Sequence, residues 1–149
     1  MGKAKILVVD DNEKNVELLE ALLQAAEFDV LKAYNGKQAI EMVGKARPDL
    51  LLLDIMMPEL DGFQVCEMLR KDPQNAGLPV MMVTAKDKES DIVQSLERGA
   101  DEYIVKPIDK KELLAKIGDL LVKASKHNLP SQFYFKKMGS QQPDTQKEP

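Results

Sequence analysis

The sequence predicts an α/β fold in which a parallel β-sheet is covered by helices on both faces. Short apolar runs alternate with segments of helical periodicity, and the order strand then helix repeats five times along the chain. Most of the runs are continuously apolar, as in strands that are buried on both faces. Strict alternation of strands and helices is typical of a parallel sheet.

Four apolar runs predict strands that are buried on both faces, and a mixed run predicts a strand at the border of the sheet. The mixed run extends from Phe28 to Tyr34, where Asp29 and Lys32 accompany apolar residues as in an edge strand that faces solvent on one side. The four apolar runs are Ile6-Leu7-Val8-Val9, Leu50-Leu51-Leu52-Leu53, Val80-Met81-Met82-Val83 and Tyr103-Ile104-Val105.

Helices are expected in the gaps between these strands. The first helix is amphipathic, because Val16, Leu19 and Leu23 recur at helical spacing. The last helix is amphipathic in the same way and is marked by Leu113, Leu114, Ile117, Leu120 and Leu121. Weaker patterns predict three helices between them, over Gly36 to Lys45, Gly62 to Lys71 and Asp87 to Arg98.

The chain is expected to form one domain over residues 1–124, followed by a C-terminal tail over residues 125–149. Its 149 residues match the size of one typical domain. The segment from Asn128 to Pro149 is rich in Pro, Gln, Ser, Lys and Asp and holds one aromatic cluster, Phe133-Tyr134-Phe135. We interpret this tail as a flexible end, as a segment that docks on a partner or on its own domain, or as the start of a missing domain.

The composition argues against several classes of function. A net charge of −4 and a pI near 5.1 leave no surplus of Lys and Arg for binding nucleic acid or anionic lipid. The apolar runs are too short to span a membrane, and the N-terminus lacks the apolar region of a signal peptide. The single cysteine, Cys66, excludes an intrachain disulfide and is expected in the core. We therefore expect a cytoplasmic protein that binds neither nucleic acid directly nor a membrane.

Polar residues that could carry chemistry follow four of the predicted strands directly: Asp10-Asp11, Asp54, Thr84 and Lys106-Pro107. Ligands of an open parallel sheet bind outside the carboxyl ends of its strands, so these residues should meet at one edge. Taken singly, each also has an ordinary structural interpretation. Asp10-Asp11-Asn12 and Thr84 could cap helices, Asp54 could belong to a turn, and Lys106-Pro107 could start the last helix.

Together, these residues predict a phosphoryl-transfer site. Three neighbouring carboxylates repel one another unless they bind a cation or stay partly protonated. Mg²⁺ prefers oxygen ligands and is usually held by one or two carboxylates plus phosphate oxygens, and Lys106 would add positive charge. Asp54 stands alone after a central strand, so we expect it to be the nucleophile that forms an aspartyl phosphate. Thr84 would offer its hydroxyl to a phosphate oxygen and move inward with its loop.

The chain resembles the receiver domain of two-component response regulators, the family that includes the diffusible chemotaxis regulator, over about residues 4–124. The segment LLLLDIMMPELDG, from Leu50 to Gly62, is similar to the phosphoacceptor loop of that family. Three further motifs match in order: VVDDN at Val8 to Asn12, VTAK at Val83 to Lys86 and GADEYIVKPID at Gly99 to Asp109. This resemblance implies a flavodoxin-like (βα)5 doubly wound parallel sheet with strand order 2-1-3-4-5.

For the phosphoryl site, the resemblance implies that a histidine kinase or phosphotransfer protein phosphorylates Asp54. Asp11, Asp54 and the main-chain carbonyl of Met56 would bind Mg²⁺, or Mn²⁺ as an alternative, and Asp10 would act largely through water. Lys106 would contact the phosphoryl group.

For the response to phosphorylation, the resemblance implies that Thr84 hydrogen-bonds to the phosphoryl group and that Tyr103 changes rotamer with it. The bond from Lys106 to Pro107 would be cis. The downstream protein target would bind the face formed by the fourth helix, the fifth strand and the fifth helix. Met56 and Lys86 fall where the family varies, which leaves the lifetime of the phosphoryl group open.

The family consists of regulators that catalyse only their own phosphorylation and dephosphorylation, so an enzyme with a separate substrate is not expected. A haloacid-dehalogenase-like phosphatase has a DxD arrangement after the first strand, whereas Asp10 and Asp11 are adjacent here. A flavodoxin-like FMN protein needs a Ser-, Thr- or Gly-rich loop at this place, and this loop is acidic. An adaptor that had lost phosphorylation would not need this set of residues.

A single-domain regulator and the receiver part of a longer multidomain regulator remain alternatives. His127, the single histidine, lies after the last helix without a catalytic partner, and we expect it to be solvated.

Overall fold

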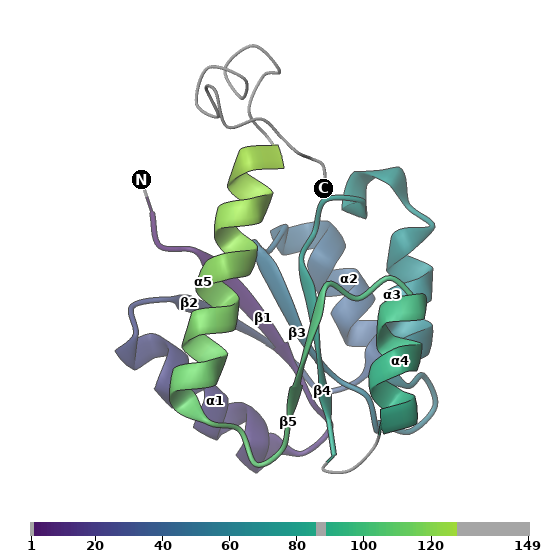
Figure 1. Cartoon of the computed structure of the whole chain (residues 1–149), viewed down its shortest axis with the longest axis horizontal. Coiled ribbons are helices and arrows are strands. Elements are labelled where there is room, and N and C mark those ends of the chain that lie inside the picture. Colours follow the sequence, from purple (N-terminus) through teal and green to yellow (C-terminus); the bar gives the residue numbers. More distant parts are fainter. Residues whose placement is uncertain (1, 86–88, 128–149) are drawn as a thin grey trace.

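Five parallel strands form one sheet in the computed structural model, which describes residues 2–85 and 89–127 (Figure 1). The strand order is β2-β1-β3-β4-β5, which confirms the predicted order. The strands are β1 (Lys5–Val9), β2 (Asp29–Ala33), β3 (Leu50–Asp54), β4 (Val80–Thr84) and β5 (Glu102–Val105). Every residue of β3 and β4 is buried, as their continuous apolar runs require.

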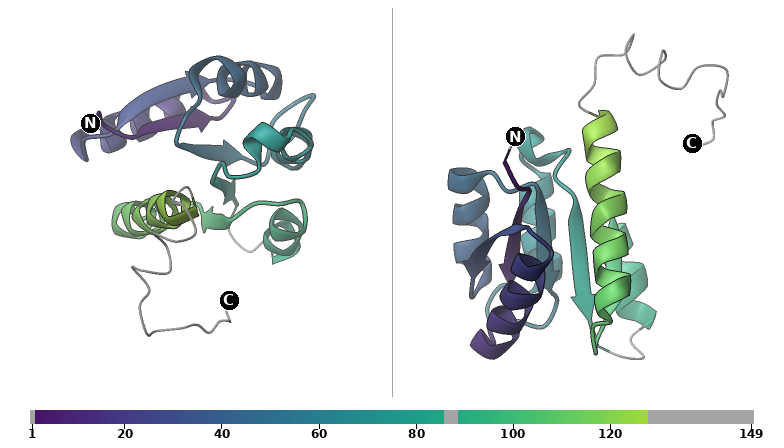
Figure 2. Two further views of the ribbon diagram at one scale, coloured as in Figure 1. Left: turned by 90° about the horizontal axis from the view of Figure 1, so that it is seen from above. Right: turned by 90° about the vertical axis from the view of Figure 1, so that its left-hand side faces the viewer.

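Helices cover both faces of the sheet, so that the protein has three layers (Figure 2). One face is covered by α1 (Glu13–Ala25) and α5 (Lys110–His127), and the other by α2 (Gly36–Ala46), α3 (Gly62–Arg70) and α4 (Glu89–Glu97). A short 3₁₀ helix, η1 (Pro73–Asn75), connects α3 to β4. Alternate strand residues contribute to two separate cores, because successive side chains of a strand point to opposite faces.

The two edge strands are β2 and β5. The mixed sequence of β2 correctly predicted its place at the border, since Asp29 and Lys32 are exposed there. The predicted strand order also places β5 at an edge, but its apolar run predicted burial on both faces, whereas three of the four residues of β5 are only partly buried. Helices α4 and α5 flank this edge (Figure 1).

The last helix is longer than the sequence suggested. Its apolar pattern ends at Leu121, but α5 continues to His127, past the expected domain boundary at residue 124. Lys123 and Ala124 are good helix formers, and extending an existing helix requires no further apolar face. The remainder of the expected tail and its aromatic cluster lie outside the described residues, as do Lys86 and the predicted helix start at Asp87.

Residues near the two ends of the described chain lie close together. Gly2, Lys3, Ala124 and Ser125 line the same hollow, at the edge of the sheet where the strands begin. Helix α5 runs antiparallel to β5, which brings its end back to this edge (Figure 1). In the described ranges, no helix combines the length and the apolar composition needed to cross a membrane.

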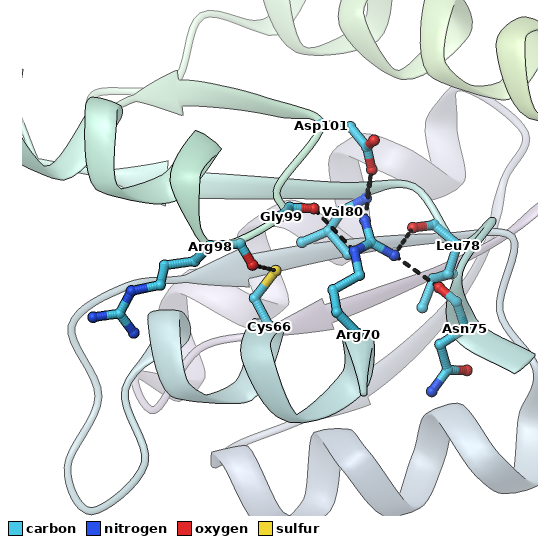
Figure 3. Close-up of polar contacts among 8 residues, drawn as sticks. All are labelled: Cys66, Arg70, Asn75, Leu78, Val80, Arg98, Gly99 and Asp101. Atoms are coloured by element: carbon cyan, nitrogen blue, oxygen red, sulfur yellow. Dashed lines mark hydrogen bonds and ion pairs between the residues drawn. The ribbon is translucent and has the colours of Figure 1, made fainter. Parts of the chain in front are cut away.

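Arg70, the last residue of α3, contacts the segment between α3 and β4 and the loop between α4 and β5 (Figure 3). Its guanidinium donates to the carbonyl oxygens of Asn75 and Leu78 at 2.8 Å and to that of Gly99 at 2.9 Å. It also pairs with the carboxylate of Asp101 at 2.9 Å. The side chain of Arg70 is only 19% exposed. Its contacts connect α3, η1 and the loop before β5.

Candidate functional site

Three carboxylates meet where β1 and β3 end. Asp10 and Asp11 follow β1, and Asp54 is the last residue of β3. One oxygen atom from each carboxylate lies within 4.8 Å of those from the other two. Asp10 and Asp54 are buried, whereas Asp11 is exposed. The cluster is therefore anchored in the protein and open to solvent on the side of Asp11.

Asp10 is held in the cluster by local hydrogen bonds. Its carboxylate accepts the backbone N–H of Asn12 at 3.0 Å and the side-chain amide of Asn15 at 3.1 Å. Asn12 is the residue that caps α1, because its side chain accepts the N–H groups of Lys14 and Asn15. The capping role that the sequence left open for this motif thus belongs to Asn12, and Asp10 remains directed at the cluster.

Lys106 brings positive charge to the three carboxylates. Its Nζ lies 3.0 Å from Oδ1 of Asp54 and 3.8 Å from Oδ2 of Asp10. Burial lowers the pKa of the Lys106 ammonium, but the hydrogen bond and charge of Asp54, together with Asp10 and Asp11, outweigh it and leave that pKa raised. The peptide bond from Lys106 to Pro107 is cis. The protonated amine offsets part of the repulsion between the carboxylates.

Asp54 has a pKa of about 6, raised from an ordinary value of 3.8. Burial is the main cause and the charge of Asp10 is the next, while the hydrogen bond and charge of Lys106 act in the opposite direction. A divalent cation beside these oxygens would favour the ionised form of Asp54. An all-oxygen set of carboxylates is the donor set that Mg²⁺ and Mn²⁺ take, so the residues fit either ion.

The loop after Asp54 is fixed by a close contact with the start of α3. The Gly62 N–H donates to the carbonyl of Ile55 at 2.8 Å. A Cβ at Gly62 would lie 2.6 Å from the carbonyl oxygen of Asp54, closer than non-bonded atoms approach, so glycine is required here. Met56 lies in this loop with its side chain 71% exposed, and the role of its carbonyl as a metal ligand stays a prediction.

Thr84 lies on β4, the strand next to β3, and Tyr103 lies on β5, the edge strand that follows β4 in the sheet. Thr84 ends β4, is 1% exposed and donates its hydroxyl to the carbonyl of Ala85 at 3.4 Å. Tyr103 is partly buried against the core on the α2 and α3 side. Among the described residues, Asp10, Asp11, Asp54 and Lys106 form one contacting group. The backbone N–H of Lys106 donates to the Thr84 carbonyl at 2.8 Å, whereas no side-chain hydrogen bond or ion pair between described residues connects Thr84 or Tyr103 to the group.

Sequence reasoning did not identify two residues that contact the predicted site residues. Asn15 holds Asp10, and its place in the first turn after the acidic pair was a usable signal. Lys116 contacts Tyr103 from α5, with its Nζ 2.6 Å from the Tyr103 carbonyl oxygen and 4.6 Å from the ring centroid. No motif marks Lys116, because this contact depends on how α5 packs beside the edge of the sheet.

Cys66, the single cysteine, lies in the core and apart from this site. Cys66 is fully buried and donates its Sγ–H to the carbonyl of Arg98 at 3.4 Å, which confirms the prediction that it is a core residue (Figure 3). Burial raises the pKa of the Cys66 thiol. His127 is the last residue of α5, and its side chain lies outside the described part of the chain.

Comparison with known proteins gives a single family. A family model described as the response regulator receiver domain matches residues 6–118. The response regulator PleD of Caulobacter vibrioides is 47% identical over 117 residues, which cover 78% of this chain and 26% of PleD. The alkaline phosphatase synthesis transcriptional regulatory protein PhoP of Bacillus subtilis is 44% identical over 117 residues, which cover 78% of this chain and 48% of PhoP. The chain thus spans about a quarter to a half of the length of these curated relatives.

Solved structures of single receiver-sized chains match along nearly their whole length. A putative response regulator from Chloroflexus aurantiacus J-10-fl has a TM-score of 0.79 and 32% identity, covering 80% of this chain and 98% of that one. The Vibrio cholerae chemotaxis protein CheY4 has a TM-score of 0.75 and 28% identity, covering 80% of this chain and 99% of that one.

Proposed function

The chain belongs to the response regulator receiver domain family of two-component signalling, and on this basis we propose that it is a phosphorylation switch whose acceptor is Asp54. The phosphoryl group would come from a histidine kinase or a phosphotransfer protein. The observation that carries the proposal is the surroundings of Asp54: a buried carboxylate at the end of the central strand, 3.0 Å from the Lys106 amine and grouped with Asp10 and Asp11.

In the proposed reaction, an ionised oxygen of Asp54 bonds to phosphorus while the bond from phosphorus to the donor's histidine nitrogen breaks. Asp10, Asp11, Asp54 and the Met56 carbonyl would hold Mg²⁺ or Mn²⁺, which when bound offsets the negative charge of the carboxylates and of the phosphoryl oxygens. Lys106 would exchange its hydrogen bond to Asp54 for one to a phosphoryl oxygen. The protein's contribution is position and charge, as phosphoryl transfer demands.

We further propose that Thr84 and Tyr103 transmit the phosphorylated state to a protein-binding face made of α4, β5 and α5. The Thr84 hydroxyl would turn from the Ala85 carbonyl to the new acceptor oxygens. Exposed apolar side chains support protein binding at this face: Val93 and Leu96 on α4 are 55% and 49% exposed, and Val122 on α5 is 54% exposed.

Two settings fit this switch. A single-domain regulator would act through protein contacts alone, in line with the net charge of −4. As the receiver part of a longer regulator, it would control a domain that follows α5; some relatives are named as transcriptional or DNA-binding regulators. In both settings we assign the receiver function to the first 124 residues, together with the rest of α5.

Incubation with a small phosphodonor such as acetyl phosphate tests the proposal. The unaltered protein should gain one phosphoryl mass in the presence of Mg²⁺ and none with chelator, and the bond should be labile to base as an acyl phosphate. Asp54→Asn should gain none, because an amide is not a nucleophile of this kind. Asp119→Asn, an exposed carboxylate on α5, is the matched control and should label normally. Equal labelling of Asp54→Asn, or labelling independent of metal, would contradict the proposal.

A further inference from the structure

On the outer side of β5, two side chains form hydrogen bonds with the backbone of Tyr103. Because β5 is an edge strand, the backbone groups on its outer side have no strand partner. The Tyr103 N–H donates to the carboxylate of Glu102 at 3.0 Å, and the Tyr103 carbonyl accepts from the Lys116 amine at 2.6 Å. Both backbone groups of Tyr103 are therefore satisfied by side chains, one of which comes from α5 beside the edge (Figure 1).

Lys116 makes more contacts than this backbone hydrogen bond requires. Its Nζ lies 4.6 Å from the centroid of the Tyr103 ring, within range of a cation–π interaction. It also forms ion pairs with Glu112 at 3.2 Å and with Glu102 at 3.5 Å. With only 22% of the Lys116 side chain exposed, the ammonium is partly removed from water, which strengthens its attraction to the ring face.

These contacts respond differently to a movement of Tyr103. The hydrogen bond to the backbone carbonyl and the two ion pairs do not depend on the rotamer of the ring. The cation–π contact does, because it exists only while the ring stays under the ammonium. A contact present in one conformation and absent in another shifts the equilibrium toward the first by its own free energy.

We propose that Lys116 is a positioning residue that holds the Tyr103 ring in the conformation seen here. It would thereby set the fraction of protein that must be phosphorylated before the ring changes conformation. Glu102 and Glu112 keep the ammonium in place for this task. The inference rests on the proposed function, in which Tyr103 moves when Asp54 is phosphorylated. It adds to that function a specific residue on α5 that opposes the change.

Carbon-13 NMR of ring-labelled tyrosine tests this during titration with beryllium fluoride and Mg²⁺, a mimic of the phosphoryl group. The chain has three tyrosines, so Tyr34→Phe and Tyr134→Phe assign the Tyr103 signal. In Lys116→Met, the signal should shift at a concentration about threefold to tenfold lower than in the unaltered protein, the range expected for one partly desolvated cation–π contact. Lys116→Arg should restore the original midpoint, since a guanidinium also stacks on aromatic rings.

The control for a charge change on the same helix is Lys123→Met, an exposed residue of α5 whose midpoint should not move. Lys116→Gln, which keeps a hydrogen-bond donor but no charge, makes the same test if Lys116→Met does not fold. A lower melting temperature with an unchanged midpoint would overturn the inference, because it would leave Lys116 a purely structural role. If the unaltered protein itself shows no response to beryllium fluoride, the proposed function fails, and the inference fails with it.

Discussion

Asp54 combines burial with proximity to two other carboxylates, and this combination controls its protonation. The folded protein holds the Asp54 proton more tightly than the unfolded chain does, since the pKa rises from 3.8 to about 6 on folding. The stabilising contribution of this proton is fully present below about pH 4 and is lost as the pH rises through 6. In the absence of a divalent cation, an ionised Asp54 is therefore destabilising at neutral pH.

Asp54→Asn removes that ionisation and is expected to stabilise the metal-free protein. At pH 7.5 the free energy of unfolding should increase by on the order of 1–3 kcal/mol, with the upper value set by the full pKa shift. The increase should shrink toward zero as the pH falls to 4. Urea unfolding followed by circular dichroism measures it, since the chain has no Trp. A gain that stays constant with pH would show that the charge of Asp54 is not its source.

The sequence predicted that the acidic residues and Lys106 would lie together, because the carboxyl ends of parallel strands meet at one edge. Asp10, Asp11, Asp54 and Lys106 come together for that reason. In the motif around Asp10, the sequence alone could not tell which residue caps α1 and which belongs to the site. The answer depends on which side chain accepts the first backbone N–H groups of α1, and that residue is Asn12. The contact of Lys116 with Tyr103 could not be predicted from the sequence either, because this contact depends on how α5 packs beside β5.

The start of α3 fixes the loop that carries Asp54, and Gly62 is the point of contact. Gly62→Ala should destabilise the protein by roughly 1–3 kcal/mol, because the new methyl group would meet backbone atoms that have little freedom to move. It should also slow labelling by acetyl phosphate, since Asp54 would be displaced. Thermal unfolding and intact mass measure the two effects.

Gly118→Ala is the matched control for this change. Gly118 lies in α5, where a new methyl group would have no neighbour within 4 Å, so alanine should stabilise the helix by roughly 0.5–1 kcal/mol and leave labelling unaffected. Equal effects of the two substitutions would contradict a special role for the close approach at Gly62.

The end of α3 is tied to the rest of the fold by Arg70, whose planar guanidinium reaches three carbonyls and Asp101. Arg70→Lys keeps the charge but cannot make all of these contacts, and should lower the free energy of unfolding by on the order of 2 kcal/mol. Arg47→Lys is the control: Arg47 is exposed, makes one side-chain hydrogen bond to Gln74, and should change stability by less than about 0.5 kcal/mol. Urea unfolding compares the two variants, and a similar small effect in both would argue against Arg70 as a structural joint.

Elements with a clear apolar period were predicted more reliably than their ends. The spacing of Val16, Leu19 and Leu23 identified α1, and all three are buried. The end of α5 was missed because its last residues continue the helix through backbone hydrogen bonds rather than through an apolar face. The edge position of β5 followed from the predicted strand order, but the partial exposure of its side chains could not be read from its apolar run.

On the scale of the whole molecule, alternation of strands and helices was sufficient to predict a doubly wound parallel sheet. The order of the strands was not contained in that alternation, and it followed from the family resemblance. The fold class could be predicted from periodicity and the strand order could not, for a physical reason. Periodicity indicates which residues are buried, whereas strand order depends on which of several crossover connections the chain takes.

The sheet separates the reactive edge from the ends of the described chain, which lie together where the strands begin. A surface tether or a fluorescent protein attached at Gly2 would thus start from the edge of the sheet opposite Asp54. A phosphodonor at Asp54 and an attachment at Gly2 would therefore use opposite edges of the sheet. A signal that leaves through the end of α5 must consequently cross the full height of the sheet, through the packing of the domain itself.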